Sequence, residues 1–184
     1  EVNRFLAEIP NSLVWGVGET PEELPCKGRC ELKHADNLVI WTAPSSQSVL
    51  DEVIRKTKPK RVLVIGMSPS ISSPKAFLER LGGLVKYAVR YKNGRSTQEE
   101  LASACAETNT SIRLGLNFWE ALGKLEMKYE EDEIELSLVD NDPNPGLKET
   151  YQSLLQVSLD ESKTYRRYFQ KGDLRNFLPS GKRS

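Results

Sequence analysis

Two cysteines and the single histidine lie close together near the start of the chain and could bind a metal ion. Cys26 and Cys30 flank Lys27-Gly28-Arg29, and His34 follows. A structural zinc site needs four ligands, usually with cysteines in closer pairs, and the third cysteine, Cys105, is distant in the sequence. We therefore interpret this segment as a loop with two thiols and expect no metal site in this chain.

Two glycine-containing turns follow predicted strands and could bind a nucleotide phosphate. Gly16-Val17-Gly18-Glu19 is a fragment of the dinucleotide-binding fingerprint, and Gly66-Met67-Ser68-Pro69 lacks the Walker pattern. Turn geometry accounts for these glycines. The only histidine falls in a predicted loop, and no carboxylate pair occurs in a recognisable motif. The sequence therefore predicts no catalytic residue, no complete catalytic site and no cofactor in this chain.

Three polar side chains could read DNA from one face of a helix predicted to start near residue 110. Apolar residues at helical spacing face one way, whereas Arg113, Asn117 and Lys124 face the other way. Arginine and asparagine can each form two hydrogen bonds with a base in the major groove. The competing interpretation is that this face is only the solvated side of an amphipathic helix.

Basic residues alternate with aromatic residues near the C-terminus. A helix predicted over residues 162–170 carries Tyr165, Tyr168 and Phe169. The basic side chains of this segment are Lys163, Arg166, Arg167 and Lys171. Such a surface can follow single-stranded DNA through phosphate contacts and base stacking. Alternatively, the aromatic rings pack on the N-terminal part of the chain while the basic groups reach water. We favour packing, because several aromatic anchors in a short segment are typical of a docked helix.

An acidic hairpin is predicted before this tail, with strands over residues 124–129 and 133–139. Between Glu126 and Asp142 there are eight acidic residues and one basic residue, Lys128. An acidic surface repels phosphate, because duplex binding depends on Lys and Arg. The turn is therefore a candidate site for a basic protein partner. Its residues are Glu130, Glu131, Asp132 and Glu133.

These side chains are positioned by three predicted helices and the hairpin over residues 73–140, which is the order of a winged helix-turn-helix. The first helix begins at Ser73-Pro74, a side-chain cap followed by proline at the first helical position. Gly82-Gly83 in its middle predicts the close approach of a neighbouring helix. Ser96 with Glu99 predicts a capping box for the second helix, and Thr108 a cap for the third.

An α/β unit is predicted over residues 1–72. A short amphipathic helix over residues 2–9 precedes three apolar runs, over residues 12–17, 37–42 and 61–65, that suit buried strands of a parallel sheet. A helix capped by Ser46 lies between the second and third of these apolar runs and completes a right-handed crossover. Residues 141–184 form a proline-containing connector and two helices. The predicted fold class is α/β, with a small three-stranded, mainly parallel unit, a winged helix-turn-helix and a C-terminal helical tail.

Composition limits the classes of function. The 184 residues include 26 Lys and Arg and 26 Asp and Glu, so any nucleic-acid contact depends on local patches. No apolar run reaches membrane-spanning length and no signal peptide is visible. Three cysteines fit a reducing compartment. We expect a cytoplasmic protein that binds no membrane. Because the chain begins at Glu1 without an initiator methionine, we also expect a piece of a longer protein.

Four stretches carry a family pattern: LVIWTAP at 38–44, FLERLGGLVKYAVRYKNGR at 77–95, IRLGLNFWEALG at 112–123 and TYRRYFQKGDLRNFL at 164–178. Together they resemble the C-terminal region of bacterial-type RecJ single-strand-specific DNA exonucleases. The resemblance implies a part of a 5′-to-3′ exonuclease of DNA repair and recombination that uses manganese or magnesium. The Asp and His motifs that hold the metal in that family do not occur in this sequence.

The resemblance therefore implies a non-catalytic accessory region. Its partners would be repair proteins such as a helicase or a single-strand-binding protein, with single-stranded DNA as a further ligand. The location implied is a bacterial-type cytoplasm, or an organelle of bacterial descent. The competing prediction is a free-standing winged-helix DNA-binding regulator in which Arg113, Asn117 and Lys124 read a groove. A third is an enzyme site at the C-terminal edge of the parallel sheet.

Overall fold

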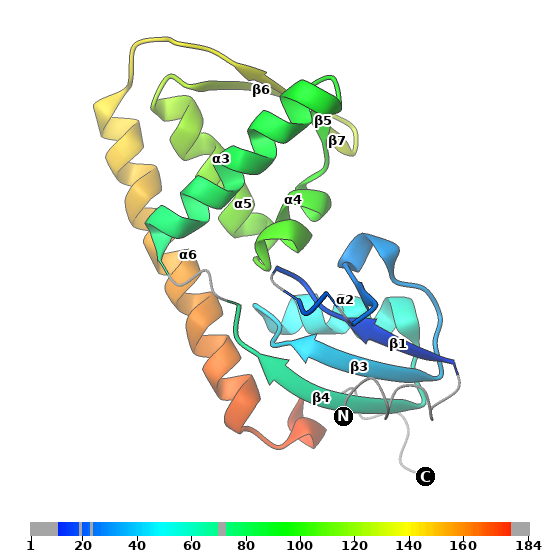
Figure 1. Cartoon of the computed structure of the whole chain (residues 1–184). Coiled ribbons are helices and arrows are strands. Elements are labelled where there is room, and N and C mark those ends of the chain that lie inside the picture. The colour runs from blue at the N-terminus through cyan, green and yellow to red at the C-terminus, as the bar shows by residue number, and fades with distance from the viewer. Residues whose placement is uncertain (1–10, 19, 23, 70–72, 178–184) are drawn as a thin grey trace. The chain divides into compact units, whose positions relative to one another are not determined.

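The computed structural model describes residues 11–18, 20–22, 24–69 and 73–177, so the helix predicted over residues 2–9 lies outside the described residues. The described residues form a mixed α/β structure with a small parallel sheet and five α-helices, the last of them C-terminal (Figure 1). Two compact units divide the chain. Unit 1 comprises residues 1–70 and 162–184, and unit 2 comprises residues 71–161. The last α-helix, α6 (Pro145–Lys171), contributes residues to both units.

Unit 1 contains a parallel sheet whose strand order is β2-β1-β3-β4. The strands are β1 (Ser12–Trp15), β2 (Cys26–Lys27), β3 (Asn37–Thr42) and β4 (Arg61–Met67). In the register of the sheet, Val39 of β3 lies between Val14 of β1 and Leu63 of β4. The three apolar runs therefore form the predicted parallel strands. The prediction of only three strands is wrong, because β2 pairs with β1 and its two residues are too few to carry an apolar pattern.

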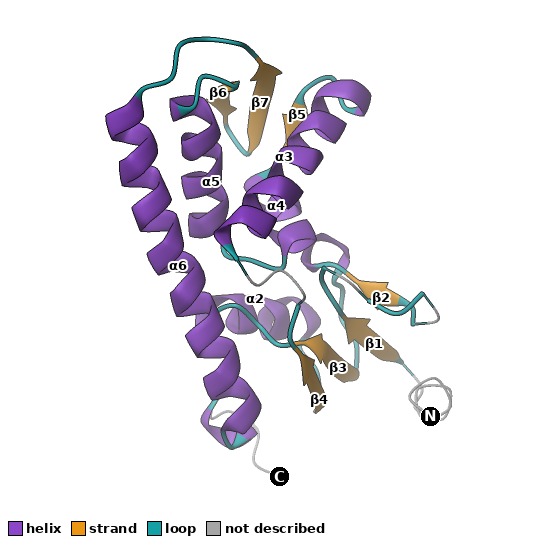
Figure 2. Ribbon diagram, turned by 60° about the vertical axis from the view of Figure 1, so that its left-hand side comes forward, coloured by secondary structure: helices purple, strands orange, loops and turns teal. Residues whose placement is uncertain are grey.

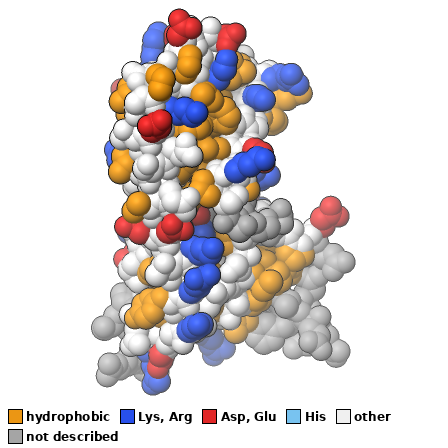
Figure 3. All heavy atoms as spheres, turned by 90° about the vertical axis from the view of Figure 1, so that its left-hand side faces the viewer, with side chains coloured by type: hydrophobic (Ala, Val, Ile, Leu, Met, Phe, Trp, Pro, Cys, Tyr) orange, Lys and Arg blue, Asp and Glu red, His pale blue; other side chains and the backbone are white. Residues whose placement is uncertain are grey.

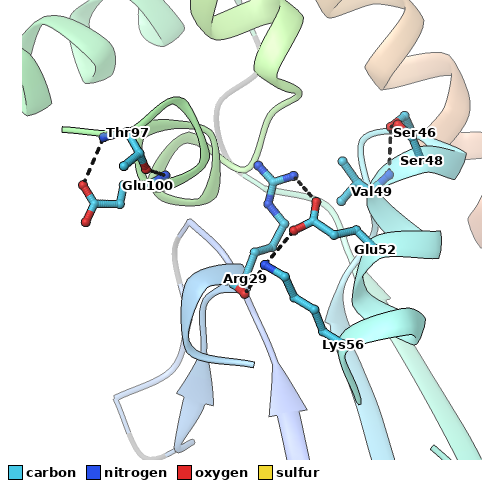
Figure 4. Close-up of polar contacts among 8 residues, drawn as sticks. All are labelled: Arg29, Ser46, Ser48, Val49, Glu52, Lys56, Thr97 and Glu100. Atoms are coloured by element: carbon cyan, nitrogen blue, oxygen red, sulfur yellow. Dashed lines mark hydrogen bonds and ion pairs between the residues drawn. The ribbon is translucent and has the colours of Figure 1, made fainter. Parts of the chain in front are cut away.

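Helix α2 (Gln47–Thr57) connects β3 to β4 and forms the predicted crossover. The Ser46 hydroxyl caps its first turn by accepting a hydrogen bond from the backbone N–H of Val49 at 3.2 Å (Figure 4). The helix ends at Lys58, whose φ of 46° lies in the left-handed region. The apolar side of α2 is buried, so both the cap and the stripe follow from the local sequence.

A buried arginine joins α2 to the short turn η1 (Arg29–Glu31). The Arg29 guanidinium lies 3.5 Å from the Glu52 carboxylate, and the Lys56 ammonium lies 2.9 Å from the same carboxylate (Figure 4). Lys56 also donates a hydrogen bond to the carbonyl of Arg29 at 3.2 Å. The segment that sequence analysis interpreted as a simple loop is therefore held to α2 by a charged network within unit 1.

Unit 2 contains three helices, a three-stranded antiparallel sheet and the first part of α6 (Figure 2). In chain order its elements are α3 (Pro74–Tyr91), β5 (Arg95–Ser96), α4 (Gln98–Cys105), α5 (Asn109–Ala121), β6 (Leu125–Glu130) and β7 (Glu133–Leu138). The three helices and the hairpin thus occur in the predicted order. They surround one apolar core that includes Phe77, Leu81, Val85, Leu101, Ile112, Leu116, Leu125, Ile134, Leu136 and Leu155.

Helices α3 and α5 approach each other closely at Gly115 of α5. A Cβ atom at this position would lie 2.6 Å from Leu81 Cδ2 and 2.8 Å from Phe77 Cε1, both on α3. Those two side chains are fully buried, so neither can move aside without disturbing the core. Only glycine therefore permits this helix contact.

The Gly82-Gly83 pair of α3 is explained only in part by the predicted close approach. A Cβ at Gly82 would lie 3.3 Å from the indole ring of Trp119 on α5, which confirms the prediction at that residue. A Cβ at Gly83 would meet no atom within 4 Å. Packing therefore gives no reason for the second glycine, although glycine in a helix costs about 1 kcal/mol relative to alanine.

The second helix of unit 2 begins one residue later than predicted. Thr97 is the cap: its hydroxyl accepts from the Glu100 N–H at 3.0 Å, and the Glu100 carboxylate accepts from the Thr97 N–H at 3.4 Å (Figure 4). The predicted pair of Ser96 and Glu99 is wrong, because Ser96 belongs to β5, where it pairs with Ile134 of β7. The strand therefore delays the start of the helix.

The prediction of two separate tail helices is also wrong. Helix α6 continues for 27 residues, because residues 156–161 contain neither glycine nor proline. Gln156 donates a hydrogen bond to Asp160 at 2.9 Å within this stretch. Within unit 2, the Ser158 hydroxyl lies 2.9 Å from that of Ser111 on α5, and both are buried. This buried hydrogen bond joins the middle of α6 to α5.

Glycine replacements on the two helices should differ in stability. Gly115→Ala and Gly83→Ala both gain helix propensity, but only the first forces a Cβ against Leu81 and Phe77. We expect Gly115→Ala to have a free energy of unfolding lower than that of Gly83→Ala by about 1–3 kcal/mol, the usual cost of overpacking. Urea denaturation followed by circular dichroism measures the difference, and equal stabilities would contradict the close contact.

The buried thiol of α4 should make stability depend on alkaline pH. Burial raises the pKa of Cys105 from 9.0 to about 12. The unfolded chain loses this proton above about pH 9, whereas the folded chain keeps it, so the free energy of unfolding should fall by about 1.4 kcal/mol per pH unit between these values. Urea denaturation over this range should show a shallower fall for Cys105→Ala. If the free energies of unfolding of the parent chain and Cys105→Ala fell in parallel with pH, the thiol would have the same pKa in the folded and unfolded chain.

Candidate nucleic-acid interface

The polar face of α5 carries the predicted base-reading residues but little net charge. Arg113 is exposed and Asn117 is half-buried. Glu120 is exposed seven residues after Arg113, on the same side of the helix, and adds a negative charge. Lys124 follows the helix and donates a hydrogen bond to Asp140, which lowers the pKa of that carboxyl below its ordinary value. The structure therefore brings the three predicted residues to one region but offsets two of their charges.

The four basic residues predicted in the tail have different surroundings. Lys163, Arg167 and Lys171 are exposed, whereas Arg166 is only 6% exposed. Figure 3 shows Lys and Arg side chains following one another along the lower part of the face that α6 occupies. Three of the four candidates are therefore accessible to a phosphate backbone, and Arg166 is a buried residue of the helix.

The aromatic residues of the tail pack within unit 1 to different degrees. The Tyr165 hydroxyl donates a hydrogen bond to the Gln47 side chain of α2 at 2.9 Å. Phe169 is 2% exposed, and its ring centroid lies 5.1 Å from that of Phe177. The predicted packing is confirmed for these two residues. The Tyr168 ring also lies beside Phe177, with centroids 5.0 Å apart, but 58% of this residue is exposed, so it buries less surface.

The acidic turn between β6 and β7 is exposed, as a partner site requires. Glu131 has a φ of 48°, which lets the chain reverse between the two strands. Glu133 lies 3.5 Å from Arg95 of β5, and both side chains are well exposed. Within the part of the chain that the structure describes, Glu130, Glu131 and Asp132 form no ion pair. The turn therefore presents a net negative charge.

A pocket of about 490 Å³ lies in unit 2. Its walls are mostly apolar and come from α3, α5 and the hairpin strands, with Gly82, Gly83 and Trp119 among the lining residues. Lys86 and Lys124 add positive charge to the lining, and Glu79 adds a negative charge. Its size is in the range of small-ligand sites. Sequence analysis did not find this pocket, because it interpreted both glycines of the pair as sites of close helix approach, which holds only for Gly82.

The exposed face of α3 was also missed by sequence analysis. Tyr87 and Tyr91 are 53% and 67% exposed, and their ring centroids lie 5.0 Å apart with a tilt of 42°. Lys86 and Arg90 precede them in the sequence, are exposed, and form no ion pair among the described residues. The signal was the sequence KYAVRY, in which two basic-aromatic pairs recur after four residues and so lie on one side of a helix.

The glycine turns of unit 1 have structural explanations. A Cβ at Gly16 would lie 2.9 Å from Cys26 Sγ, while Gly18 and Gly66 have φ values of 75° and 68°. These positions need glycine whether or not a nucleotide binds. Over the described residues, no three His, Cys, Asp or Glu side chains come together in a group that could hold a metal ion.

Comparisons with known proteins relate this chain to no family, curated protein or solved structure. A scan of family models, a search of curated proteins and a search of solved structures each gave no match to this chain. None of the helices in the described ranges has the length and apolar character needed to span a membrane.

Two aromatic replacements in the tail should separate packing from surface exposure. Phe169→Ala removes a buried ring and should lower the free energy of unfolding by about 3–5 kcal/mol. Tyr168→Ala removes an exposed ring and should cost about 1 kcal/mol or less. Thermal and urea denaturation measure both changes. Similar small losses in the two variants would contradict the packing of this part of α6 in unit 1.

Proposed function

We propose that this chain is a non-catalytic accessory region of a RecJ-like single-stranded-DNA exonuclease of DNA repair and recombination. Two features support the proposal: the four resembling stretches and the element order of unit 2. Strand β5 lies between α3 and α4 in the sequence and pairs with β7 of the hairpin. Helix, strand, helix, helix and hairpin is the order of a winged helix-turn-helix, which we propose as the fold of this unit.

The proposed role is to bind a repair partner, and the acidic turn is the observation that carries it. Glu130, Glu131, Asp132 and Glu133 are exposed on a tight turn. A winged helix that reads duplex DNA would gain from Lys and Arg at this position, because phosphate binding depends on them. A negative turn instead suits a partner with a basic surface, such as a helicase or a single-strand-binding protein.

Single-stranded DNA is a second proposed ligand. Exposed Lys163, Arg167 and Lys171 on α6 support contact with a phosphate backbone. Duplex reading by α5 has weaker support, because Glu120 and Asp140 offset the charges of Arg113 and Lys124. The manganese or magnesium ions of the exonuclease would belong to a catalytic core outside this chain. The proposed location is a bacterial-type cytoplasm.

Charge reversal at the turn tests partner binding. We expect Glu130→Lys with Glu131→Lys to lower the affinity for a purified repair partner by ten-fold or more at low salt, that is by about 1.4 kcal/mol. Glu149→Lys, an exposed single reversal on α6, is the control for charge reversal away from the turn and should lower the affinity by less than half as much in free energy. Isothermal titration calorimetry measures all three affinities.

Other outcomes would point to different functions. Unchanged affinity in the turn variant would remove the turn from partner binding. Cleavage of labelled single-stranded DNA by the purified chain with manganese would contradict a non-catalytic role. Duplex binding that Arg113→Ala weakens by about 1–3 kcal/mol would favour the winged-helix regulator instead.

A further inference from the structure

The exposed face of α3 is strongly basic although the whole chain is neutral. Its exposed charged residues are Lys75, Glu79, Arg80, Lys86 and Arg90. The one carboxylate, Glu79, lies 3.9 Å from Lys75, which leaves an excess of positive charge toward the C-terminal end of the helix. Phosphate groups are the natural counter-ions of such a surface.

Exposed tyrosines lie beside these cations. Tyr87 and Tyr91 each leave more than half of their surface in contact with solvent, so the apolar core does not require them. Their rings are neighbours on successive turns of α3. A flat aromatic surface next to Lys and Arg is the usual platform for an unpaired nucleobase, which stacks on the ring while its phosphate meets the cation. Bases in a duplex already stack on one another, so this platform favours a single strand.

The pocket lies next to the basic face of α3, on the side of Lys86 opposite to Tyr87. Around the helix axis, Gly82 and Tyr87 lie on opposite sides of Lys86, because successive residues are about 100° apart. Lys86 lines the pocket, and so does Glu79, the carboxylate paired with Lys75. Gly83 also lines it, and no packing contact explains that glycine. Because Gly83 has no side chain, the pocket stays open toward the basic face of α3. The pocket has a volume of 490 Å³ and is lined by the Trp119 indole, so it can accept one base.

We propose that the exposed face of α3 and the adjoining pocket bind single-stranded nucleic acid. Lys86 and Arg90 contact phosphates, Tyr87 and Tyr91 stack on bases, and one base enters the pocket beside Trp119. This site lies entirely within unit 2. It deepens the single-strand part of the proposed function, but it rests on the surface of α3 and not on the relation to exonucleases.

Paired tyrosine variants test the stacking. Fluorescence anisotropy of the full chain with fluorescein-labelled oligo(dT) and oligo(rU) gives the dissociation constants for DNA and RNA. We expect Tyr87→Ala and Tyr91→Ala each to weaken binding about five-fold or more, as the loss of one stacked base does. The matched variants Tyr87→Phe and Tyr91→Phe keep the ring and should bind like the parent chain. Equal affinities of the Ala and Phe variants would overturn the stacking role.

Charge variants test the phosphate contacts and separate this site from α6. Removing two phosphate contacts by Lys86→Gln with Arg90→Gln should reduce the slope of log affinity against log salt by about 1.4. Lys163→Gln with Arg167→Gln is the matched pair on α6. If only the α6 pair weakens binding, the α3 site is wrong while the proposed function stands. If the parent chain binds neither oligonucleotide, the α3 proposal fails and partner docking at the acidic turn is unaffected.

Filling the pocket tests its part in the site. Gly83→Leu adds a side chain where no atom lies within 4 Å of the new Cβ, so the fold should be retained or stabilised. We expect weaker binding of both oligonucleotides together with an unchanged or higher melting temperature. Unchanged affinity in a folded Gly83→Leu variant would exclude the pocket from the site.

Discussion

The close contact of α3 and α5 at Gly115 is the constraint on which unit 2 depends. It sets the buried stripe of α3 against the core, because Phe77 and Leu81 fill the space that any other residue at this position would need. Once that stripe is buried, helical geometry determines which residues of α3 lie on the opposite face. The cations and tyrosines of α3 must then face solvent. The same packing places Trp119 against Gly82 and leaves an open pocket beside them. A contact in the core thus determines a surface that can bind a ligand.

The exposed surfaces of the chain differ in charge, and this difference decides which kind of partner each surface attracts. The turn around Glu131 is negative, the outer face of α3 is positive, and α5 is nearly balanced because Glu120 lies near Arg113. Phosphate is attracted to the second surface and repelled by the first. A chain of zero formal net charge can therefore carry a positive and a negative surface at different places. The overall charge alone shows neither surface.

Much of the fold follows from local sequence, since caps, apolar stripes and turns are local properties. The parallel strands, α2 and the order of elements in unit 2 are predicted in this way. Strand β2 is not, because its two residues carry no pattern. The two predicted tail helices are one helix, α6, because residues 156–161 contain no residue that ends a helix. The candidate surfaces are less predictable. Exposure of Tyr87 and burial of Arg166 both depend on which neighbours cover a helix, and the pocket depends on two helices and both strands of the hairpin.

The central claim is that unit 2 binds a single strand through α3 and not a duplex through α5. Nuclear magnetic resonance of the labelled chain, titrated with oligo(dT) and then with a duplex, tests this claim most directly. The account predicts that oligo(dT) shifts the amide signals of Lys86, Tyr87 and Tyr91 and the indole signal of Trp119, while the duplex causes only small shifts. Large shifts at Arg113 and Asn117 on adding the duplex, with α3 unperturbed by either ligand, would contradict it.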